Sequence, residues 1–338
     1  MFYKYLRNAT FYSAILICAG VGAFELDKKA IDEFAMELSN KHNFDDLKIK
    51  EVLAAAVGSD KIIQLMSKPA EKTKSWKDYK NIFINPSRVS KGCIFWKANK
   101  ESLDLAVSTY GVPQSIIASL IGIETFYGKI TGNHRLIDSL PTLAFHYPNG
   151  NKKRKQFFRY QLKEFFLLSR EEGFEPKSIR GSYAGALGIP QFMPNNYRQL
   201  AVDFDLDGDR DILRSYADSI GSVANYLSHH GWQGGAPIFA DATLKKGHGY
   251  TMEENPSSTS TSIGHLVSIG FDIRRQDIST DMPASVVRFK VGRSDKYWIV
   301  FRNFYSLFRY NPRVKYALVV ALLASSIEEK CDLGDKSN

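Results

Sequence analysis

Apolar residues recur every three or four positions along most of the N-terminal two thirds of the chain, as they do on one face of a helix. Ile31, Phe34 and Leu38 follow this spacing, and a second run begins at Leu47. The stretch 25–68 is therefore predicted to form two helices.

The same periodicity predicts further helices beyond a lysine-rich connecting stretch between Pro69 and Pro86. Prolines disfavour helix in the residue before them and often mark helix limits. A Gly-Val-Pro run at 111–113 separates two of these helices, and Gly231 closes a later one. The predicted helices are 93–110, 113–128, 152–172, 218–230 and 314–324.

Past Pro237 the pattern changes from helical spacing to alternation. Residues 285–289 and 297–301 alternate as strands do, with Gly292 in the turn between them. A short helix at 263–268 follows a Ser/Thr-rich loop that can cap it. We therefore expect a mainly α (α+β) protein with a small β-rich insertion at 237–305.

The first 23 residues have the pattern of an export signal. Lys4 and Arg7 form a short basic start, the run 9–23 is largely apolar, and Val-Gly-Ala at 21–23 resembles a cleavage site. The apolar run is shorter than the about 20 residues of a comfortable membrane span. We expect export to the periplasm or cell envelope of a bacterium, with cleavage after Ala23; an uncleaved anchor is the alternative.

Cleavage would remove Cys18 and leave two cysteines, Cys93 and Cys331. In an oxidising compartment they can pair, but two separate thiols fit the sequence equally well. The sequence leaves this choice open.

Composition indicates a folded protein with an anionic partner. Hydrophobic residues make up 44% of the chain, enough for a sizeable core, which excludes wholesale disorder. The net charge of +9 favours nucleic acid, acidic lipid or cell wall as a partner, without choosing among them. The 22 Phe, 17 Tyr and 4 Trp suit a groove that stacks on sugar or base faces.

Glu124 stands on the apolar face of the helix predicted at 113–128. Ile116, Leu120 and Glu124 are each four residues apart, so the carboxyl group shares the side that packs inward. A carboxyl group that loses hydration holds its proton more strongly, which suits it to donate that proton near neutral pH. A buried Glu with a purely structural partner is the alternative.

A glycine-rich block at 181–194 presents two polar side chains among small and apolar residues. The small residues let the backbone approach a neighbouring element or a ligand closely. Ser182 and Gln191 can then hydrogen-bond a carboxylate or a substrate amide. A tight glycine loop without a ligand is the alternative.

The acidic run at 203–211 is similar to the start of an EF-hand loop. Aspartates occupy positions one, three, five and nine, and Gly208 is at six. Arg214 stands at twelve, where an EF-hand has a bidentate Glu, so Asp218 would have to close an enlarged loop. A solvated acidic turn is the alternative. The predicted ligands of a structural Ca²⁺ or Na⁺ ion are Asp203, Asp205, Asp207, Asp209 and Asp218.

Together these motifs resemble the lytic murein transglycosylase B family of peptidoglycan-cleaving enzymes. The match includes Trp-Lys-Asp-Tyr at 76–79, Tyr-Gly-Val-Pro at 110–113 and Ile-Glu-Thr at 123–125. It continues through the glycine-rich block and Tyr-Asn at 310–311, and it covers nearly all of residues 30–325 in order.

The resemblance implies a lysozyme-like catalytic core flanked by helical and small β subdomains. It places Glu124 as the single catalytic acid and base, with Ser182 and Gln191 orienting it and binding the saccharide. The cleft residues that it implies are Tyr79, Tyr226, Tyr310, Asn311 and Tyr316. The implied division is a signal at 1–23, a helical subdomain and linker at 24–100, the core at 101–236 with its EF-hand-like loop at 203–218, the insertion at 237–305 and a returning segment at 306–331.

One carboxylate is fewer than ordinary glycosidases use. It suffices if the sugar supplies its own nucleophile, so we expect cleavage of the β-1,4 bond between N-acetylmuramic acid and N-acetylglucosamine without water. The products would carry 1,6-anhydromuramic ends, and no cofactor would take part in catalysis.

Two other functions remain as alternatives. A lysozyme-type hydrolase of peptidoglycan or chitin would use Asp138 as its second carboxylate, although we expect Asp138 to brace the helix after it. A non-catalytic cell-wall-binding protein would hold glycan without cutting it. The expected partners of a monomer are peptidoglycan glycan strands, with cell-wall synthesis or secretion machinery beside them, and not nucleic acid.

Overall fold

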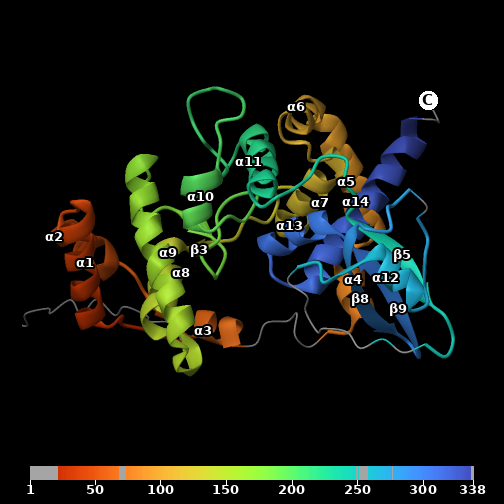
Figure 1. The fold of residues 1–338 in the computed structure, drawn as a ribbon. Coiled ribbons are helices and arrows are strands. Elements are labelled where there is room, and N and C mark those ends of the chain that lie inside the picture. The colour runs from red at the N-terminus through yellow and green to blue at the C-terminus, as the bar shows by residue number, and fades with distance from the viewer. Residues whose placement is uncertain (1–21, 68–73, 249, 251–257, 276, 336–338) are drawn as a thin grey trace, which may run out of the picture.

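Helices dominate the computed structural model, which describes residues 22–67, 74–248, 250, 258–275 and 277–335 (Figure 1). The N-terminal helices lie at one end of the molecule and the β-sheet lies at the other. The predicted signal, including Cys18, falls outside the described residues except for its last two positions. Of these, Ala23 lies in a short strand, Ala23–Phe24 (β1), that pairs with Gly58–Ser59 (β2).

The two helices predicted at 25–68 are present, and a third follows them. Asp27 and Asp45 cap the first two, because each carboxylate accepts hydrogen bonds from amides of the first turn. The three helices are Lys28–His42 (α1), Asp46–Ala54 (α2) and Asp60–Ser67 (α3).

The apolar face of α1 packs on a second pair of helices. Phe34 is buried, and its ring lies beside those of Phe145 and Phe166. These rings belong to Leu136–His146 (α8) and Lys152–Glu171 (α9). The helix predicted at 152–172 is therefore confirmed, whereas α8, which contains Pro141, was not predicted.

The stretch predicted as a connection between Pro69 and Pro86 contains a helix, Trp76–Phe83 (α4). Ser75 starts it, because its Oγ accepts a hydrogen bond from the backbone amide of Asp78 at 3.2 Å. The prediction was wrong here because the lysines of this short segment concealed its apolar face.

The single helix predicted at 93–110 is two helices, Pro86–Ala98 (α5) and Lys100–Tyr110 (α6). Asn99 leaves helical geometry between them, and its Nδ2 donates to the carbonyl of Phe95 at 2.8 Å. Periodicity did not reveal the break because apolar spacing continues on both sides of it.

Helix Gln114–Thr125 (α7) lies in the core, and nearly all of its side chains are buried. It ends at Thr125 rather than at Gly128 as predicted, because Phe126 and Tyr127 have φ values of 52° and 62°. This left-handed backbone terminates the helix before the glycine is reached.

The last helix, Val314–Asp335 (α14), extends beyond the predicted 314–324 and packs against α7 and α5. Its extra turns carry Cys331, which forms a disulfide with Cys93 of α5; their Cα atoms lie 5.4 Å apart. The pairing that the sequence left open is therefore formed.

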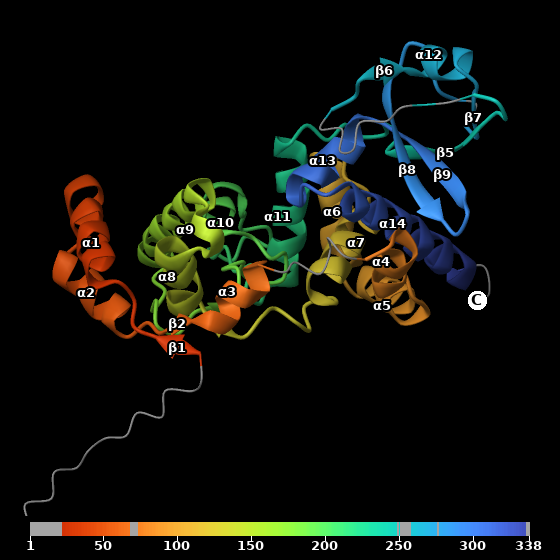
Figure 2. The ribbon, with the colours of Figure 1, turned by 90° about the horizontal axis from the view of Figure 1, so that it is seen from below.

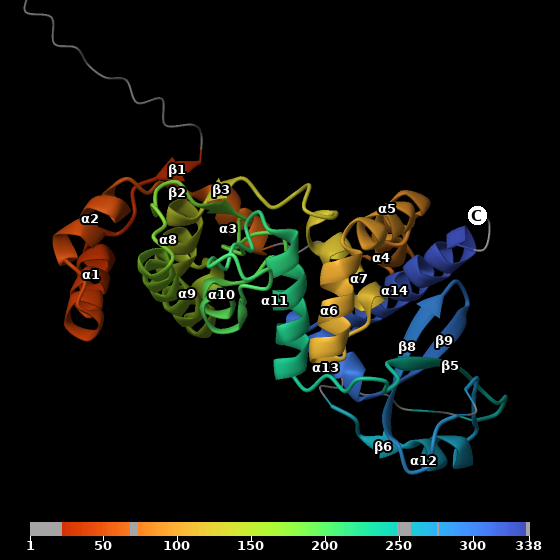
Figure 3. The same ribbon diagram turned by 90° about the horizontal axis from the view of Figure 1, so that it is seen from above.

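Helix Tyr216–His229 (α11) lies between Pro194–Leu200 (α10) and the α6–α7 pair, as Figures 1 and 3 both show. It corresponds to the helix predicted at 218–230. The remaining helices are Pro194–Leu200 (α10), Ile263–Ser268 (α12), Arg302–Tyr310 (α13) and a 3-10 turn at Pro148–Gly150. Of these, α12 matches its prediction, and the others were not predicted.

A five-stranded antiparallel sheet occupies the expected insertion (Figure 2). The strand predicted at 285–289 lies within the first strand of its central hairpin, and the strand predicted at 297–301 overlaps the second, which ends at Val300. Gly292 in the turn between them has a φ of 64°. Trp76 of α4 stacks on Phe289 with ring centres 4.7 Å apart, which joins the sheet to the helices. In spatial order the strands are Thr261–Ser262 (β6), Pro283–Val291 (β8), Ser294–Val300 (β9), Phe239–Leu244 (β5) and Phe271–Ile273 (β7).

Among the described residues, no single helix combines the length and apolar content of a membrane span. Helices α6 and α7 have that length and apolar content only when taken together, and the pair is bent by 116°.

Candidate active site

Glu124 lies in the last turn of α7 and is half-buried. The phenol Oη of Tyr316 donates a hydrogen bond to its Oε1. Tyr316 is 3% exposed and stands near the start of α14, the helix that packs along α7. Packing between these helices therefore holds the Tyr316 hydroxyl in a fixed position from which it donates to the carboxyl group.

A second phenol, that of Tyr310, lies near Tyr316 and Glu124. Tyr310 donates its Oη proton to the carbonyl of Pro190 at 2.6 Å. Burial raises the pKa of both Tyr310 and Tyr316 well above the usual value, and the charge of Glu124 raises it further. Both phenols therefore stay protonated at neutral pH and act as donors.

The glycine-rich block folds into a tight loop that needs its small residues. Ser182 and Ala186 exchange hydrogen bonds: the Ser182 amide donates to the Ala186 carbonyl at 2.9 Å, and the Ala186 amide donates to Ser182 Oγ at 3.0 Å. A Cβ on Gly188 would lie 2.3 Å from the carbonyl oxygen of Ile212. The close approach expected from the sequence is therefore to a neighbouring segment of this chain.

Gln191 has a φ of 53°, an uncommon conformation for this residue type. Its Nε2 donates to the carbonyl oxygens of Thr131 at 2.9 Å and Gly188 at 2.8 Å. Both protons of the side-chain amide are thereby used within the protein. Only its oxygen, Oε1, can meet a donor on a ligand.

Tyr226, which the resemblance places in the cleft, is buried to 4% exposure. Its Oη donates to the carbonyl of Arg309 at 2.7 Å, and its ring packs on those of Phe192 and Tyr310. In this structure Tyr226 supports Tyr310 from behind.

A cavity of about 830 Å³ opens between α3, α4, the start of α9 and the glycine-rich loop. Of the residues implied by the resemblance, Tyr79 and Asn311 line it, whereas Glu124 does not. Sequence reasoning missed Tyr183 and Arg154 in its wall. Arg154 had a signal: it belongs to a run of four basic residues in the first turn of α9, where the helix dipole disfavours cations.

Asp138, the second carboxylate of the hydrolase alternative, is hydrogen-bonded to Arg135 and to the backbone of Val57. Arg135 Nε and Nη2 each donate to it at 2.8 Å, and the backbone amide of Val57 donates to its Oδ1 at 2.9 Å. Asp138 thus ties the start of α8 to the segment before α3. Asp138 was expected to brace a helix after it; it instead lies in the first turn of α8 and braces that helix from within.

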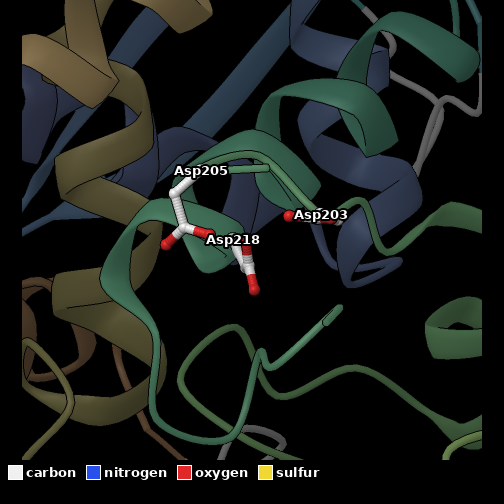
Figure 4. Close-up of side chains that lie close together, drawn as sticks. All are labelled: Asp203, Asp205 and Asp218. Atoms are coloured by element: carbon white, nitrogen blue, oxygen red, sulfur yellow. The ribbon is translucent and has the colours of Figure 1, made fainter. Parts of the chain in front are cut away.

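The acidic loop gathers three of the five predicted ligands. One carboxylate oxygen from each of Asp203, Asp205 and Asp218 lies within 4.8 Å of the others (Figure 4). Asp207 and Asp209 are not in this group. Asp207 Oδ1 instead accepts from the backbone amide of Asp209 at 2.9 Å.

Asp218 is the buried member of the group, at 1% exposure. The amides of Phe204 and Asp211 donate to its two oxygens at 2.8 and 2.7 Å. Burial raises the pKa of Asp218, and the charge of Asp205 adds to the rise. Three converging carboxylates with one of them desolvated fit a hard cation such as Ca²⁺, which takes oxygen ligands.

Comparison with known proteins gives a consistent result. The chain is 36% identical over 304 residues to membrane-bound lytic murein transglycosylase B of Escherichia coli, covering 87% of this chain and 81% of that protein. Its structure is similar to SltB1 of Pseudomonas aeruginosa, with a TM-score of 0.83, 38% identity and coverage of 90% and 99%. It is also similar to E. coli Slt35 in complex with calcium, with a TM-score of 0.79, 34% identity and coverage of 89% and 93%.

Fold and site thus define an enzyme of the lytic transglycosylase class. Residues 27–325 match the model of the transglycosylase SLT domain. The chain belongs to that family.

Proposed function

We propose that this enzyme cleaves peptidoglycan between N-acetylmuramic acid and N-acetylglucosamine without consuming water. The observation that carries the proposal is that Glu124 meets a neutral phenol while Asp138 is held by Arg135 and Val57. With Asp138 so engaged, Glu124 works as a single acid and base. Relatives named as lytic murein transglycosylases support the substrate.

In the first step, protonated Glu124 gives its proton to the glycosidic oxygen as the bond to the muramic C1 breaks. The acetamido group of the muramic sugar stabilises the cationic carbon. In the second step, ionised Glu124 takes the proton of the C6 hydroxyl while that oxygen bonds to C1. The carboxyl group ends protonated, and the product carries a 1,6-anhydro ring.

Tyr316 keeps the carboxyl group in one rotamer through both steps, because its Oη contacts Oε1 from a helix packed along α7. Oε2 is then the oxygen that transfers the proton. Gln191 offers its Oε1 to the substrate, and Ser182 lies in the same tight loop. Tyr310 and Tyr226 support this arrangement from the protein side.

The cavity lined by Tyr79 and Asn311 receives part of the glycan strand. Its ring and amide groups suit a sugar face and hydroxyls. Lys74, Arg154 and Arg313 also line it, and their charges suit the carboxylates of peptidoglycan. The protein works in the cell envelope, where this polymer lies.

The acidic loop holds one Ca²⁺ ion through Asp203, Asp205 and Asp218, and the ion stabilises the fold without entering the reaction. The complex of Slt35 with calcium supports this assignment.

Product mass tests the proposal. Purified protein is incubated with murein, and the released muropeptides are analysed by mass spectrometry. Anhydro products, each lighter by one water than the hydrolysis product, are expected. Hydrated products would instead favour the lysozyme-type alternative, in which Asp138→Asn should abolish activity.

A further inference from the structure

The turn that follows Glu124 has an unusual backbone. Phe126, Tyr127 and Gly128 have φ values of 52°, 62° and 79°, so three successive residues are left-handed. Non-glycine residues rarely adopt this conformation and persist in it only where their surroundings hold them. Two aromatic residues therefore need support immediately behind the carboxyl-bearing residue.

Thr125 supplies a contact on each side of this turn. Its side chain is fully buried, and its Oγ1 accepts a hydrogen bond from the amide of Gly128 at 3.0 Å. The same oxygen donates to the carbonyl of Ile189 at 2.9 Å, a shorter contact than the 3.3 Å to Ile121 of its own helix. One hydroxyl group thus closes the turn and binds it to another segment.

That other segment is the glycine-rich block. Ile189 precedes Pro190, whose carbonyl accepts from Tyr310, and Gln191 follows. Ile189 also donates its amide to the carbonyl of Ile212 at 2.9 Å. The Thr125 hydroxyl therefore connects the helix end that carries Glu124 to the loop that carries the other polar groups of the site.

We propose that Thr125 is a positioning residue, whose buried hydroxyl holds Glu124 at a fixed place relative to the glycine-rich block. The inference rests on Glu124 being the acid and base. Replacing the hydroxyl by a methyl group keeps the volume but leaves the half-buried amide of Gly128 and the buried carbonyl of Ile189 without this partner. The turn can then relax, and the carboxyl group moves with it.

The test compares Thr125→Val, Thr125→Ser and wild type on a soluble glycan fragment. In Thr125→Val, kcat should fall roughly ten- to a hundredfold, as expected for one lost positioned hydrogen bond. KM should change little, because the cleft walls are untouched. Thr125→Ser restores the hydroxyl and should recover most of kcat. If Thr125→Val does not fold, Thr125→Ala provides the comparison.

Ser119→Ala is the matched control. Ser119 is also fully buried on α7 and donates to a carbonyl, that of Val320 at 2.8 Å, but it lies away from the turn. This variant should lose stability and keep kcat per folded molecule. Unchanged kcat in Thr125→Val, or equal losses of kcat in Thr125→Val and Ser119→Ala, would overturn the proposal.

The result is separable from that of the product analysis. Cleavage is followed by chromatography of released fragments, which counts broken bonds whether or not water was added. Hydrated wild-type products would therefore refute water-free cleavage while the ratios among the variants still decide the role of Thr125.

Discussion

At the scale of single residues, several polar groups of the site are fixed by hydrogen bonds to buried partners. Tyr316 of α14 donates a hydrogen bond to Glu124, and Gln191 donates both of its side-chain amide protons to backbone carbonyls. Such groups cannot turn toward solvent without leaving a buried partner unsatisfied. Preorganisation of this kind suits a reaction in which one carboxyl group must act twice.

Glu124→Gln should abolish nearly all lytic activity and leave the fold intact, because an amide of the same shape cannot deliver a proton. Turbidity of a murein suspension reports the activity, and the melting temperature reports the fold. A folded variant that still digests murein at a substantial rate would refute the role of Glu124.

Tyr316→Phe should lower kcat roughly ten- to a hundredfold, because it removes one hydrogen bond to the carboxyl group and keeps the ring. Tyr197→Phe is the control: this phenol is fully buried and donates to the carbonyl of Arg210. Both variants should lose some stability, but only Tyr316→Phe should lose turnover. Equal turnover in the two would show that Tyr316 merely packs.

At the scale of elements, the acidic loop is organised by the helix that follows it. Asp218 stands in the first turn of α11, and its carboxylate accepts amides from residues on both sides of the loop. The loop is therefore fixed by the helix, and the carboxylates of Asp203 and Asp205 lie close to that of Asp218. Repulsion among these charges opposes folding when no cation balances them.

Calcium should accordingly stabilise the protein by mass action on the folded state. At a concentration one hundred times Kd, the gain is about 2.7 kcal/mol, which corresponds to a rise in melting temperature of roughly 5 °C. Scanning calorimetry of chelated and calcium-loaded protein measures it.

Two variants locate the calcium site. Asp205→Asn should remove most of the calcium response, whereas Asp209→Asn should keep it, because Asp209 is outside the converging group. If millimolar calcium leaves the melting temperature of the wild type unchanged, the calcium site is refuted.

At the scale of the whole molecule, three packed regions can be distinguished. Helices α1–α3 pack on α8 and α9, the sheet rests on α4 through Trp76, and α14 lies along α7 and α5. The disulfide between Cys93 and Cys331 closes a loop of 238 residues that runs from α5 to α14 and leaves α1–α4 outside it. It therefore restricts the unfolded chain over most of its length.

Removing this disulfide should lower the free energy of unfolding by about 2–4 kcal/mol. The double variant Cys93→Ala/Cys331→Ala is compared with wild type by urea denaturation, with and without reductant. Wild type should respond to the reductant and the double variant should not. The mass of the reaction products should be the same for both, since neither cysteine lies at Glu124. Equal stability of the two proteins would show that the disulfide contributes nothing.

Periodicity along the chain determined the inward face of α7 with Glu124 on it, the limits of α9 and α12, and the strand hairpin around Gly292. These are local properties, because the spacing of apolar residues reports which side of an element avoids water. Only the tertiary structure decided which partners meet. It paired the cysteines, buried Tyr226 behind Tyr310, joined Asp138 to the backbone amide of Val57 and ended α7 at Thr125. Each of these depends on contacts between residues distant in sequence or on backbone geometry that packing enforces, and hydrophobic spacing carries no information about either.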